Sequence, residues 1–565
     1  MAMCASVLAC LFLVSQARAQ QAPIETRLPP TTHTYIHWRG LKSLDAAKTK
    51  NGLLRLWNDP DFAPVRRAIT SEAYGRMWRV PSTGKLTPDQ LNSLIPLFEN
   101  EAVFGEIASP AAKAGAKTPN GFFIYDATGK TEVLRNAIEL LRKSAPNSTK
   151  SSTYMFGDAK VDSVETPTET YFATQVGNYY VRASRKDVEE DLITRFRAKT
   201  ATPSSLANEA DWRRAKQDFA PGAIVEVFSR ISKPSPGGLA KANEFNFSAF
   251  ASGVHLERAH AWTASLSLAG EATRLRFAIL GDTSAGSLFD VVGASSPVFE
   301  TLPLARDGSS YSVWKVNLPA IYRILHGPVL EALSQKQAGS LKGFDMLGST
   351  MLGMPVPDAL ALFGGEIATI SSTPGDPTYT DLYAATIRDP AAVVSVVRKA
   401  VGSMIQNESR SGQTTFLDLA APYTDPQTKA TLQHFYYIGV TPHVLLFSPR
   451  RTMVRDAAAR LSGAGGATLG VTLASNPDFQ HARALLPKFL TGFTYAQMTK
   501  QTWERELSVL ARTAGKAAAD SDKTGASSGD VLQGVNLSVF ARYLHSFASG
   551  WWKTPDGIYF DSYLQ

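Results

Sequence analysis

Alternating apolar and polar residues recur along the chain and predict β-strands, some of which form hairpins. We expect strands at 34–38, 122–126 and 382–386, and hairpins at 171–184 and 434–448. Gly177-Asn178 marks the turn of the first hairpin, because both residues tolerate the backbone conformation of a two-residue turn. Apolar residues at helical spacing predict helices at 131–143 and 390–401.

One order of elements occurs twice. Each copy begins with Leu-Phe-x-x-Glu, ending at Glu101 in the first copy and at Glu366 in the second, which gives an offset of 366 − 101 = 265 residues. The serines that close the two hairpins are 448 − 184 = 264 residues apart, and the aspartates of two later helix-start motifs are 478 − 211 = 267 apart. Three landmarks at nearly one offset predict an internal duplication.

The order in each copy is strand, helix, strand, hairpin, helix and strand, which predicts an α+β fold of two tandem related repeats with mixed or antiparallel sheets. Split strand-helix-strand units of ferredoxin-like type fit this order. The expected regions are a signal peptide at 1–19, an N-terminal strand and helix region at 20–96, the first repeat at 97–235, a middle connecting region at 236–361, the second repeat at 362–500, and a C-terminal region at 501–565. The middle region contains a β-hairpin at 263–280. The C-terminal region contains a helix at 503–519, a flexible connector at 521–530 and a closing hairpin that turns at 554–557.

Short motifs rich in Asn, Asp and Pro predict helix starts. Examples are Asn58-Asp59-Pro60-Asp61-Phe62, Asn208-Glu209-Ala210-Asp211-Trp212 and Asn476-Pro477-Asp478-Phe479. A capping side chain, a proline in the first turn and an acidic residue near the positive helix end all favour a helix there. Ser184 and Ser448 are expected to cap the basic helices that follow them. A ligand contact shared by both copies is the alternative interpretation of these motifs.

The N-terminus predicts export. Residues 1–19 read MAMCASVLACLFLVSQARA, an apolar stretch that ends in Ala17-Arg18-Ala19, so we expect cleavage between Ala19 and Gln20. The alternative is a short buried helix. Both cysteines lie in this segment, so the mature chain of 565 − 19 = 546 residues would have no thiol, disulfide or cysteine-based metal site. A periplasmic or secreted location follows.

The charge balance gives only a weak signal. The chain has 58 Lys and Arg against 50 Asp and Glu, and removal of Arg18 leaves 57 − 50 = +7. No basic run reaches the five to eight residues typical of a nucleic-acid patch, so we expect no nucleic-acid partner. Weak contact with an anionic membrane surface stays open. Outside the signal no apolar run approaches the roughly 18 residues that span a bilayer, so we expect no transmembrane segment in the mature chain.

Several of these segments resemble the DUF3352 family of exported bacterial proteins, a family of unknown function. The resemblance rests on the strand TYIHW at 34–38, the two Leu-Phe-x-x-Glu segments, the Asn-x-x-Asp-Phe-like helix starts, and the closing FARYL and TPDGIYFDS motifs between Phe540 and Ser562. It implies an envelope or secreted location and a duplicated α+β build. It implies no catalytic residues.

Common catalytic and metal-binding signatures are missing. His33 and His37 would lie roughly 13 Å apart on one strand face, too far for one metal, and His255 and His260 lack the HExxH spacing. There is no GxSxG motif. Ser312-Val313-Trp314-Lys315 fits SxxK, but a strand would place Ser312 and Lys315 on opposite faces. We expect no cofactor and no metal.

Glu101 and Glu366 are the weak catalytic candidates, because the duplication presents both beside apolar residues and two carboxylates can act as an acid/base pair. A polar residue at a strand entrance explains them equally well. We therefore expect a non-enzymatic envelope protein that binds or scaffolds an unidentified envelope ligand or protein, with its site in the cleft between the two copies. The alternatives are a periplasmic hydrolase of envelope polymer that uses these carboxylates, and a peripheral membrane protein.

Overall fold

The computed structural model describes residues 23–44, 50–66, 93–108, 120–144, 149–166, 170–198, 202, 204–231, 247–268, 270–284, 286–333, 335–372, 381–424, 431–463, 471–505 and 538–565. The chain forms two compact units. Unit 1 comprises residues up to Ser43, 85–219 and 224–230. Unit 2 comprises residues 44–84, 220–223 and 231–565.

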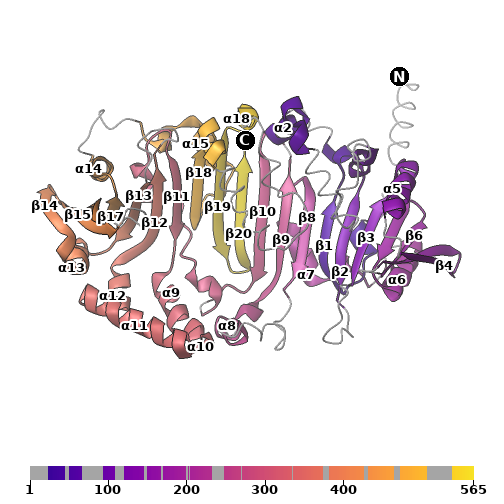
Figure 1. Cartoon of the computed structure of the whole chain (residues 1–565), viewed down its shortest axis with the longest axis horizontal. Coiled ribbons are helices and arrows are strands. Elements are labelled where there is room, and N and C mark those ends of the chain that lie inside the picture. Colours follow the sequence, from indigo (N-terminus) through magenta and orange to yellow (C-terminus); the bar gives the residue numbers. More distant parts are fainter. Residues whose placement is uncertain are drawn as a thin grey trace, which may run out of the picture. The chain divides into compact units, whose positions relative to one another are not determined.

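Unit 1 is built on an antiparallel sheet. Its strands are β1 (Thr32–Trp38), β2 (Ala102–Ile107), β3 (Gly121–Asp126), β4 (Lys150–Phe156), β5 (Ala159–Glu165), β6 (Thr170–Val176), β7 (Tyr179–Ala183) and β8 (Ala223–Arg230). They pair in the order β8-β1-β2-β3-β7-β6-β5-β4 (Figure 1). The helices of this unit are α5 (Thr131–Ser144), α6 (Lys186–Arg197) and α7 (Ala210–Asp218).

Unit 2 carries a longer antiparallel sheet. Its strands are β9 (Ala259–Ser267), β10 (Thr273–Gly281), β11 (Ser310–Lys315), β12 (Phe363–Ser371), β13 (Asp381–Ile387), β14 (Ile405–Ser411), β15 (Thr414–Thr424), β16 (Thr431–Val440), β17 (Val444–Ser448), β18 (Gly492–Gln497), β19 (Ser546–Thr554) and β20 (Gly557–Leu564). They pair in the order β9-β10-β20-β19-β18-β11-β12-β13-β17-β16-β15-β14.

The helices of unit 2 lie between these strands in the chain. They are α2 (Gly52–Asn58), α8 (Phe247–Gly253), α9 (Leu318–Ile324), α10 (Leu330–Ala332), α11 (Gln335–Leu352), α12 (Val356–Ala361), α13 (Pro390–Val401), α14 (Arg451–Leu461), α15 (Pro477–Ala484) and α18 (Ser538–Tyr543). The expected helix at 503–519 falls partly outside the described residues, of which 500–505 are helical. None of the helices in the described part of the chain is long and apolar enough to cross a membrane.

Eight strands of each unit follow one order. β1 lies between β2 and β8, as β11 lies between β12 and β18, and the remaining strands continue from β3 and β13 in corresponding sequence. Unit 2 extends this order beyond β18 with four further strands. The α+β architecture expected from the sequence is confirmed, and every strand pairing in the described residues is antiparallel.

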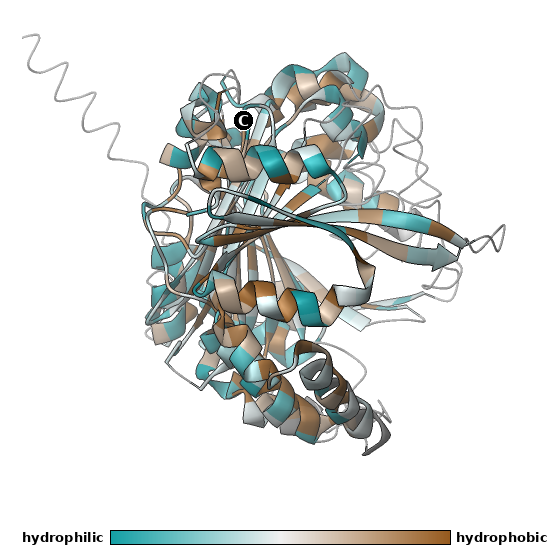
Figure 2. Ribbon diagram, turned by 90° about the vertical axis from the view of Figure 1, so that its left-hand side faces the viewer, coloured by the Kyte–Doolittle hydropathy of each residue, from teal (hydrophilic) through white to brown (hydrophobic). Residues whose placement is uncertain are grey.

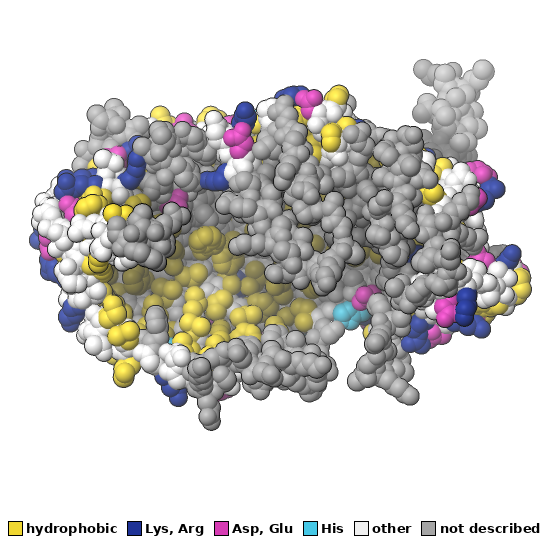
Figure 3. All heavy atoms as spheres, in the orientation of Figure 1, with side chains coloured by type: hydrophobic (Ala, Val, Ile, Leu, Met, Phe, Trp, Pro, Cys, Tyr) yellow, Lys and Arg dark blue, Asp and Glu magenta, His cyan; other side chains and the backbone are white. Residues whose placement is uncertain are grey.

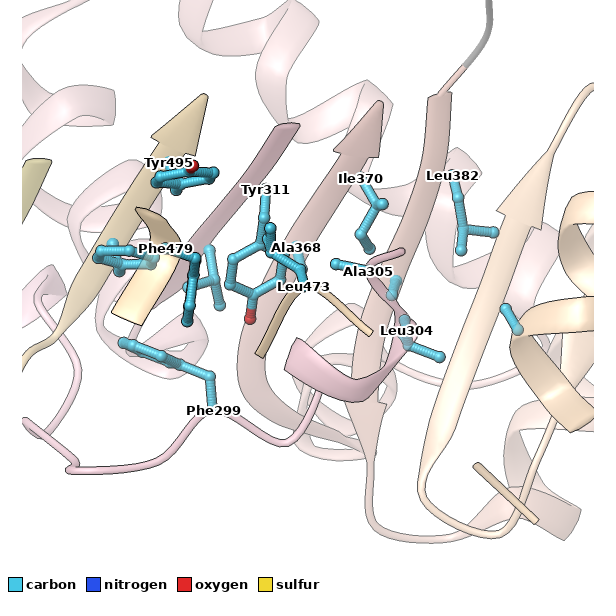
Figure 4. Close-up of a cluster of buried hydrophobic side chains, with 14 of the residues drawn as sticks. Phe299, Leu304, Ala305, Tyr311, Ala368, Ile370, Leu382, Leu473, Phe479 and Tyr495 are labelled. Atoms are coloured by element: carbon cyan, nitrogen blue, oxygen red, sulfur yellow. The ribbon is translucent and has the colours of Figure 1, made fainter. Parts of the chain in front are cut away.

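Apolar side chains on one face of the unit 2 sheet form its main core (Figure 4). Tyr311, Ile370 and Leu382 come from three neighbouring strands and pack against Phe479 of α15 and Leu473. Hydrophobic and hydrophilic residues alternate along the strands (Figure 2), so that each strand contributes only every second side chain to this core. On the other face, α13 covers β15, β16 and β17 with a second apolar cluster.

Helix starts were predicted with mixed success. The Asn476 side chain accepts a hydrogen bond from the N–H of Phe479 at the start of α15, and Asp59 caps a short 3-10 helix over Pro60–Phe62. Ser184 and Ser448 were the wrong caps, because α6 and α14 begin two or three residues later. Both serines are held by the sheet instead: the Ser184 N–H donates to the Gly121 carbonyl, and the Ser448 hydroxyl donates to the Asp381 carbonyl.

Two further expectations concern parts of the chain that lie outside the described residues. These are the signal peptide at 1–19, with its cleavage site, and the connector at 521–530. The hairpin expected at 263–280 and the closing hairpin are present as β9–β10 and β19–β20.

Candidate functional site

Glu101 lies at the start of β2 and takes part in a polar cluster of unit 1. Its Oε1 atom is 2.7 Å from Nε2 of His37, and Nδ1 of the same histidine is 3.2 Å from Oε2 of Glu226. Arg39 forms an ion pair with Glu226. The His37 and Glu226 side chains are buried, whereas the Glu101 side chain is 32% exposed. The sheet register creates this cluster, because β1 lies between β8, which carries Glu226, and β2, which begins directly after Glu101.

The charges of this cluster support one another. Burial alone would lower the pKa of His37, but hydrogen bonds to Glu101 and Glu226 outweigh burial and raise it. Burial alone would raise the pKa of Glu226, but the hydrogen bond from His37 and the Arg39 charge lower it. A histidine whose two nitrogens both donate to carboxylates has no free acceptor nitrogen. His37 is therefore poorly suited to act as a general base.

Glu366 is held differently in unit 2. Its side chain is 3% exposed, and its Oε1 atom accepts hydrogen bonds from both the N–H and the hydroxyl of Thr301, each at 2.8 Å. Lys315 lies 3.5 Å from Oε2. Each candidate glutamate thus has partners from its own unit. Neither glutamate lines the cavity at Ser312 or the cavity at Arg306 in unit 2.

The sheet face of unit 2 opposite the main core carries a row of apolar residues. Successive strand pairings place them side by side in the order Ala385, Ile367, Trp314, Gly492, Trp551, Phe560, Phe277, Ala264. We call them the apolar row. Trp314 is 42% exposed, and Figure 3 shows hydrophobic side chains gathered in a hollowed area over the middle strands of this unit. Gly492 is required here, because a Cβ atom would overlap the indole ring of Trp551.

A second row, of small hydroxyl side chains, runs parallel to the first at the adjacent register position. It consists of Thr369, Ser312, Thr494, Ser549 and Ser562, on five neighbouring strands. We call it the hydroxyl row. Ser312 and Thr494 hydrogen-bond to each other at 2.8 Å. Tyr383 and Leu275 flank the two ends of the row, and each is 44% exposed.

A cavity of about 470 Å³ lies over one part of the hydroxyl row, whose other members Ser549 and Ser562 are buried outside it. Ser312, Thr369 and Thr494 contribute to its lining. The remaining lining residues are Ser310, Tyr311, Ser371, Tyr495, Ala496, Met498, Thr502, Trp503, Arg505, Phe547 and Leu564. This volume is within the range of about 300–1,000 Å³ that small-molecule sites occupy. The cavity is large enough for a ligand, and none of its described lining residues is a carboxylate.

A smaller cavity of about 160 Å³ lies beside the first turn of α14, with Arg306, Arg450 and Arg460 in its lining. Arg306 forms an ion pair with Asp456, which also lines the cavity. Arg460 donates to the Leu304 carbonyl at 3.1 Å. Two of the arginines thus already interact with groups of the protein, so the larger cavity is the better candidate.

The other residues considered for catalysis or metal binding contact groups of the protein itself or lie apart from one another. Ser312 belongs to the cavity floor while Lys315 points to Glu366, so the SxxK residues lie on opposite faces, as predicted. His33 and His37 form no metal cluster, and no group of three His, Cys, Asp or Glu in the described ranges could hold a metal ion. His255 pairs with Glu257.

Comparison of the chain with protein-family models, curated proteins and solved structures finds no match. The candidate site therefore rests on the geometry of this molecule.

Neither row was predicted from the sequence, although one pattern in the sequence corresponds to them. A Tyr-x-x-Trp-cation pattern occurs at 35–39, where β1 ends, and again at 311–315 in β11. This pattern marks two strands that hold the same place in the shared order, and in β11 its tyrosine faces the core whereas its tryptophan faces away from it.

Proposed function

We propose that the protein is an exported, non-enzymatic binding protein of the cell envelope whose ligand occupies the cavity over the hydroxyl row. The observation that carries this proposal is the combination of a ligand-sized cavity with a sheet face that is apolar and partly exposed. Soluble proteins rarely leave large contiguous apolar surfaces without a use. Export and the resemblance to the DUF3352 family stay predictions from the sequence.

A non-catalytic role agrees with the state of the ionisable groups. The two glutamates singled out in the sequence are bound by His37 in unit 1 and by Thr301 in unit 2. Among the described residues that line the cavity, Arg505 is the one charged side chain, and none is a histidine. A general acid/base pair needs two titratable groups in reach of one substrate.

We further propose that the two units arose by duplication of one α+β unit. The shared order of eight strands supports this proposal, as do two corresponding aromatic contacts. Trp212 of α7 lies 5.4 Å from Phe228 between ring centroids, and Phe479 of α15 lies 5.2 Å from Tyr495. The residue numbers of these two pairs differ by the same offset, 479 − 212 = 267 and 495 − 228 = 267.

Ligand binding in the cavity can be tested with a panel of chemically different compounds. The purified chain is heated with oligosaccharides, peptides, long-chain carboxylates and small polar acids, and the unfolding temperature is recorded. A ligand present at 100 times its Kd stabilises the folded state by about 2.7 kcal/mol. We expect at least one class to stabilise the wild-type protein but not Ser312→Phe, which fills the cavity floor.

Ser411→Phe is the matched control, because it places the same side chain at an exposed strand end of the same unit. It should respond to the ligand as the wild type does. Thr369→Phe serves as a second cavity variant if Ser312→Phe does not fold. The proposed site would be refuted if the same ligands stabilised the cavity variants and the wild type equally. It would also be refuted if no ligand stabilised the wild type.

A hydrolase that uses Glu101 is the second candidate, favoured by the approach of this partly exposed carboxylate to His37 and Glu226. It predicts release of soluble fragments from envelope polymer by the wild type and loss of this activity in Glu101→Gln. Equal release by both proteins would remove it.

A further inference from the structure

The sheet of unit 2 ends in a strand whose outer edge is open. β14 pairs with β15 on one side, and no other described strand pairs with it. Figure 1 shows β14 as the outermost strand at the left of this sheet. Residues 406–411 are exposed, except Ser409, which is partly buried. An open edge presents unpaired N–H and C=O groups to another strand.

The hairpin turn determines which backbone groups of β14 point outward. The two-residue turn Gly412-Gln413 joins β14 to β15, and Ser411 pairs with Thr414 beside it. A two-residue turn closes on a hydrogen-bonded pair, and such pairs alternate with non-hydrogen-bonded ones along an antiparallel ladder. The N–H and C=O groups of Glu408 and Arg410 therefore face away from β15, toward the open edge.

These two residues also carry opposite charges on one face of the strand, because positions two apart share a face. Both residues are exposed. The Glu408 side chain forms an ion pair with Arg398 of α13 and is still 39% exposed. The hydrogen bond from Arg398 lowers the pKa of Glu408, so this carboxylate is charged at neutral pH. A carboxylate held at the edge in this way can accept a second cation.

A second copy of the chain supplies the complementary strand. When two β14 strands pair antiparallel about Ser409, Glu408 of each copy lies opposite Arg410 of the other. Each such pair exchanges two N–H···O=C bonds, since the outward-facing backbone groups belong to these residues. Opposite charges directly across a ladder attract each other, and the two-fold symmetry forms the contact twice.

The corresponding strand of unit 1 lacks this self-complementarity. β4 pairs only with β5 among the described strands, and its residues 150–156 include Lys150 but no acidic side chain. Two β4 strands in antiparallel pairing therefore place no carboxylate opposite the lysine, and lysine on an edge strand disfavours association between edges. Charge thus distinguishes the two edges, and β14 is the one suited to a second copy.

We infer that the protein associates with a second copy of itself through β14, in an antiparallel strand pair centred on Ser409 that joins the two unit 2 sheets. The pairing extends over 407–411, because the register of β14 is irregular before Asn407. Such a short strand pair is a small interface, so the dimer belongs to the weak class and its population depends on concentration. This inference goes beyond the proposed ligand binding and does not depend on it.

Reversal of the charges tests the contact. The full chain is analysed by sedimentation velocity over a concentration series, and we expect the wild type to shift from monomer toward dimer. Glu408→Arg and Arg410→Glu each place like charges opposite each other, so each should weaken dimerisation about tenfold or more. The variant with both changes is self-complementary again and should recover dimerisation.

A mixture provides a further test of the same contact. Glu408→Arg has arginine at both positions and Arg410→Glu has glutamate at both, so the two weakly associating variants should form a mixed dimer. The loss of the ion pair with Arg398 occurs in Glu408→Arg and in the double variant alike, so recovery in the double variant separates the two effects. Lys150→Glu on β4 is the matched control and should leave dimerisation unchanged.

Cysteine cross-linking tests the register in a chain whose Cys4 and Cys10 are replaced by serine. Ser409→Cys places two thiols in a non-hydrogen-bonded pair, whose Cα atoms are about 4.5 Å apart and within the range that a disulfide bridges. Oxidation with diamide should therefore give a covalent dimer on a non-reducing gel. Ser411→Cys is the matched control, because its two thiols would lie four residues apart along the strands, about 13 Å, and should not cross-link.

Each result decides for or against the inference. Cross-linking at Ser409 but not at Ser411 supports it even where the dimer is too weak to be resolved by sedimentation. Monomers at every concentration, without cross-linking at Ser409, would overturn it and show that the charges of β14 keep this edge unpaired. A dimer that neither single charge reversal weakens would overturn the assignment to β14, and equal cross-linking at both serines would overturn the pairing about Ser409.

Discussion

β1 of unit 1 and β11 of unit 2 hold the same place in the shared strand order. Both contain a tyrosine and a tryptophan, but the residues buried between these two differ in chemistry. Tyr35 and Tyr311 are fully buried at corresponding positions. Two residues later, unit 1 has His37, bonded to two glutamates, where unit 2 has the buried Val313. One strand order thus accommodates either a charged cluster or an apolar contact at the same point of the sheet.

The strand paired with β1 or β11 explains how the same position can hold either His37 or Val313. Opposite His37 stands Glu226 on β8, and opposite Val313 stands Phe493 on β18. The two residues differ together: histidine with glutamate in one unit, valine with phenylalanine in the other. Burial of a polar group costs stability unless a hydrogen-bonding partner is buried with it. The two residues of the cross-strand pair therefore differ together between the two units.

The largest effect should follow from breaking this pair on one side only. His37→Val leaves Glu226 buried without its histidine, and we expect a loss of about 3 kcal/mol in the free energy of unfolding, measured by urea denaturation. The double variant His37→Val with Glu226→Phe, which copies unit 2, should lose clearly less than the sum of the single variants.

His33→Val provides the control on the same strand, because His33 is partly exposed and outside the cluster; its effect should stay within about 0.5 kcal/mol. Additive losses in the double variant would show that histidine and glutamate are not coupled.

Gly492 of unit 2 corresponds to Val225 of unit 1, since Gly492 pairs with Trp314 of β11 and Val225 pairs with Trp38 of β1. Gly492→Val would push a side chain into the indole of Trp551. We expect a loss of about 2 kcal/mol and a shift in tryptophan emission. Val225→Ala should cost less than about 1 kcal/mol, and an equal cost at both sites would contradict the assigned role of the glycine.

A third difference lies in the helices that follow the hairpins. Glu189 of α6 is fully buried, and neither carboxylate oxygen has a hydrogen-bond partner in the described structure. At the corresponding position of α14, 189 + 264 = 453, stands Met453, which packs against the core. Glu189→Met should stabilise the protein by about 1.5 kcal/mol at neutral pH.

The pH profile sharpens this prediction. Burial raises the pKa of Glu189 well above its ordinary value of 4.5, so the folded state holds a proton that the unfolded chain releases. Stability is then fully present below pH 4.5 and falls as pH rises toward the raised pKa. Glu189→Met should flatten this fall in thermal unfolding curves, whereas Glu190→Met on the same helix should not.

The smallest effect concerns the two buried tyrosines. The Tyr311 hydroxyl lies 2.9 Å from the Thr301 hydroxyl, whereas the Tyr35 hydroxyl is buried with no hydrogen-bond partner among the described residues. Tyr311→Phe should therefore cost about 1 kcal/mol, and Tyr35→Phe should be neutral or slightly stabilising. Urea unfolding of the two variants would contradict this prediction if Tyr35→Phe lost more stability than Tyr311→Phe.

Local elements could be predicted from the sequence because their signals are local. Alternation gave both hairpins at 171–184 and 434–448, and the spacing of apolar residues gave α5 and α13 within about one residue. The helix caps failed at Ser184 and Ser448, because both serines are held by sheet contacts that lie far away in the chain.

Such local patterns could not predict the candidate site. The hydroxyl row takes each member from a different strand, and Ser312 and Thr494 are 182 residues apart. Only the pairing order brings them together, and that order depends on contacts distant in the chain. The contact between Glu101 and His37 was missed for the same reason, although each residue stands out in the sequence by itself.

The position of the last strand has a consequence for how the chain is made. β20 lies between β19 and β10, and Arg274 and Asp561, which pair there, are 287 residues apart. During synthesis, β10 keeps one edge open until residues 557–564 emerge, and open strand edges recruit other chains. A premature stop shortly before residue 557 would therefore expose the edges of two strands at once and turn a small truncation into a cause of aggregation.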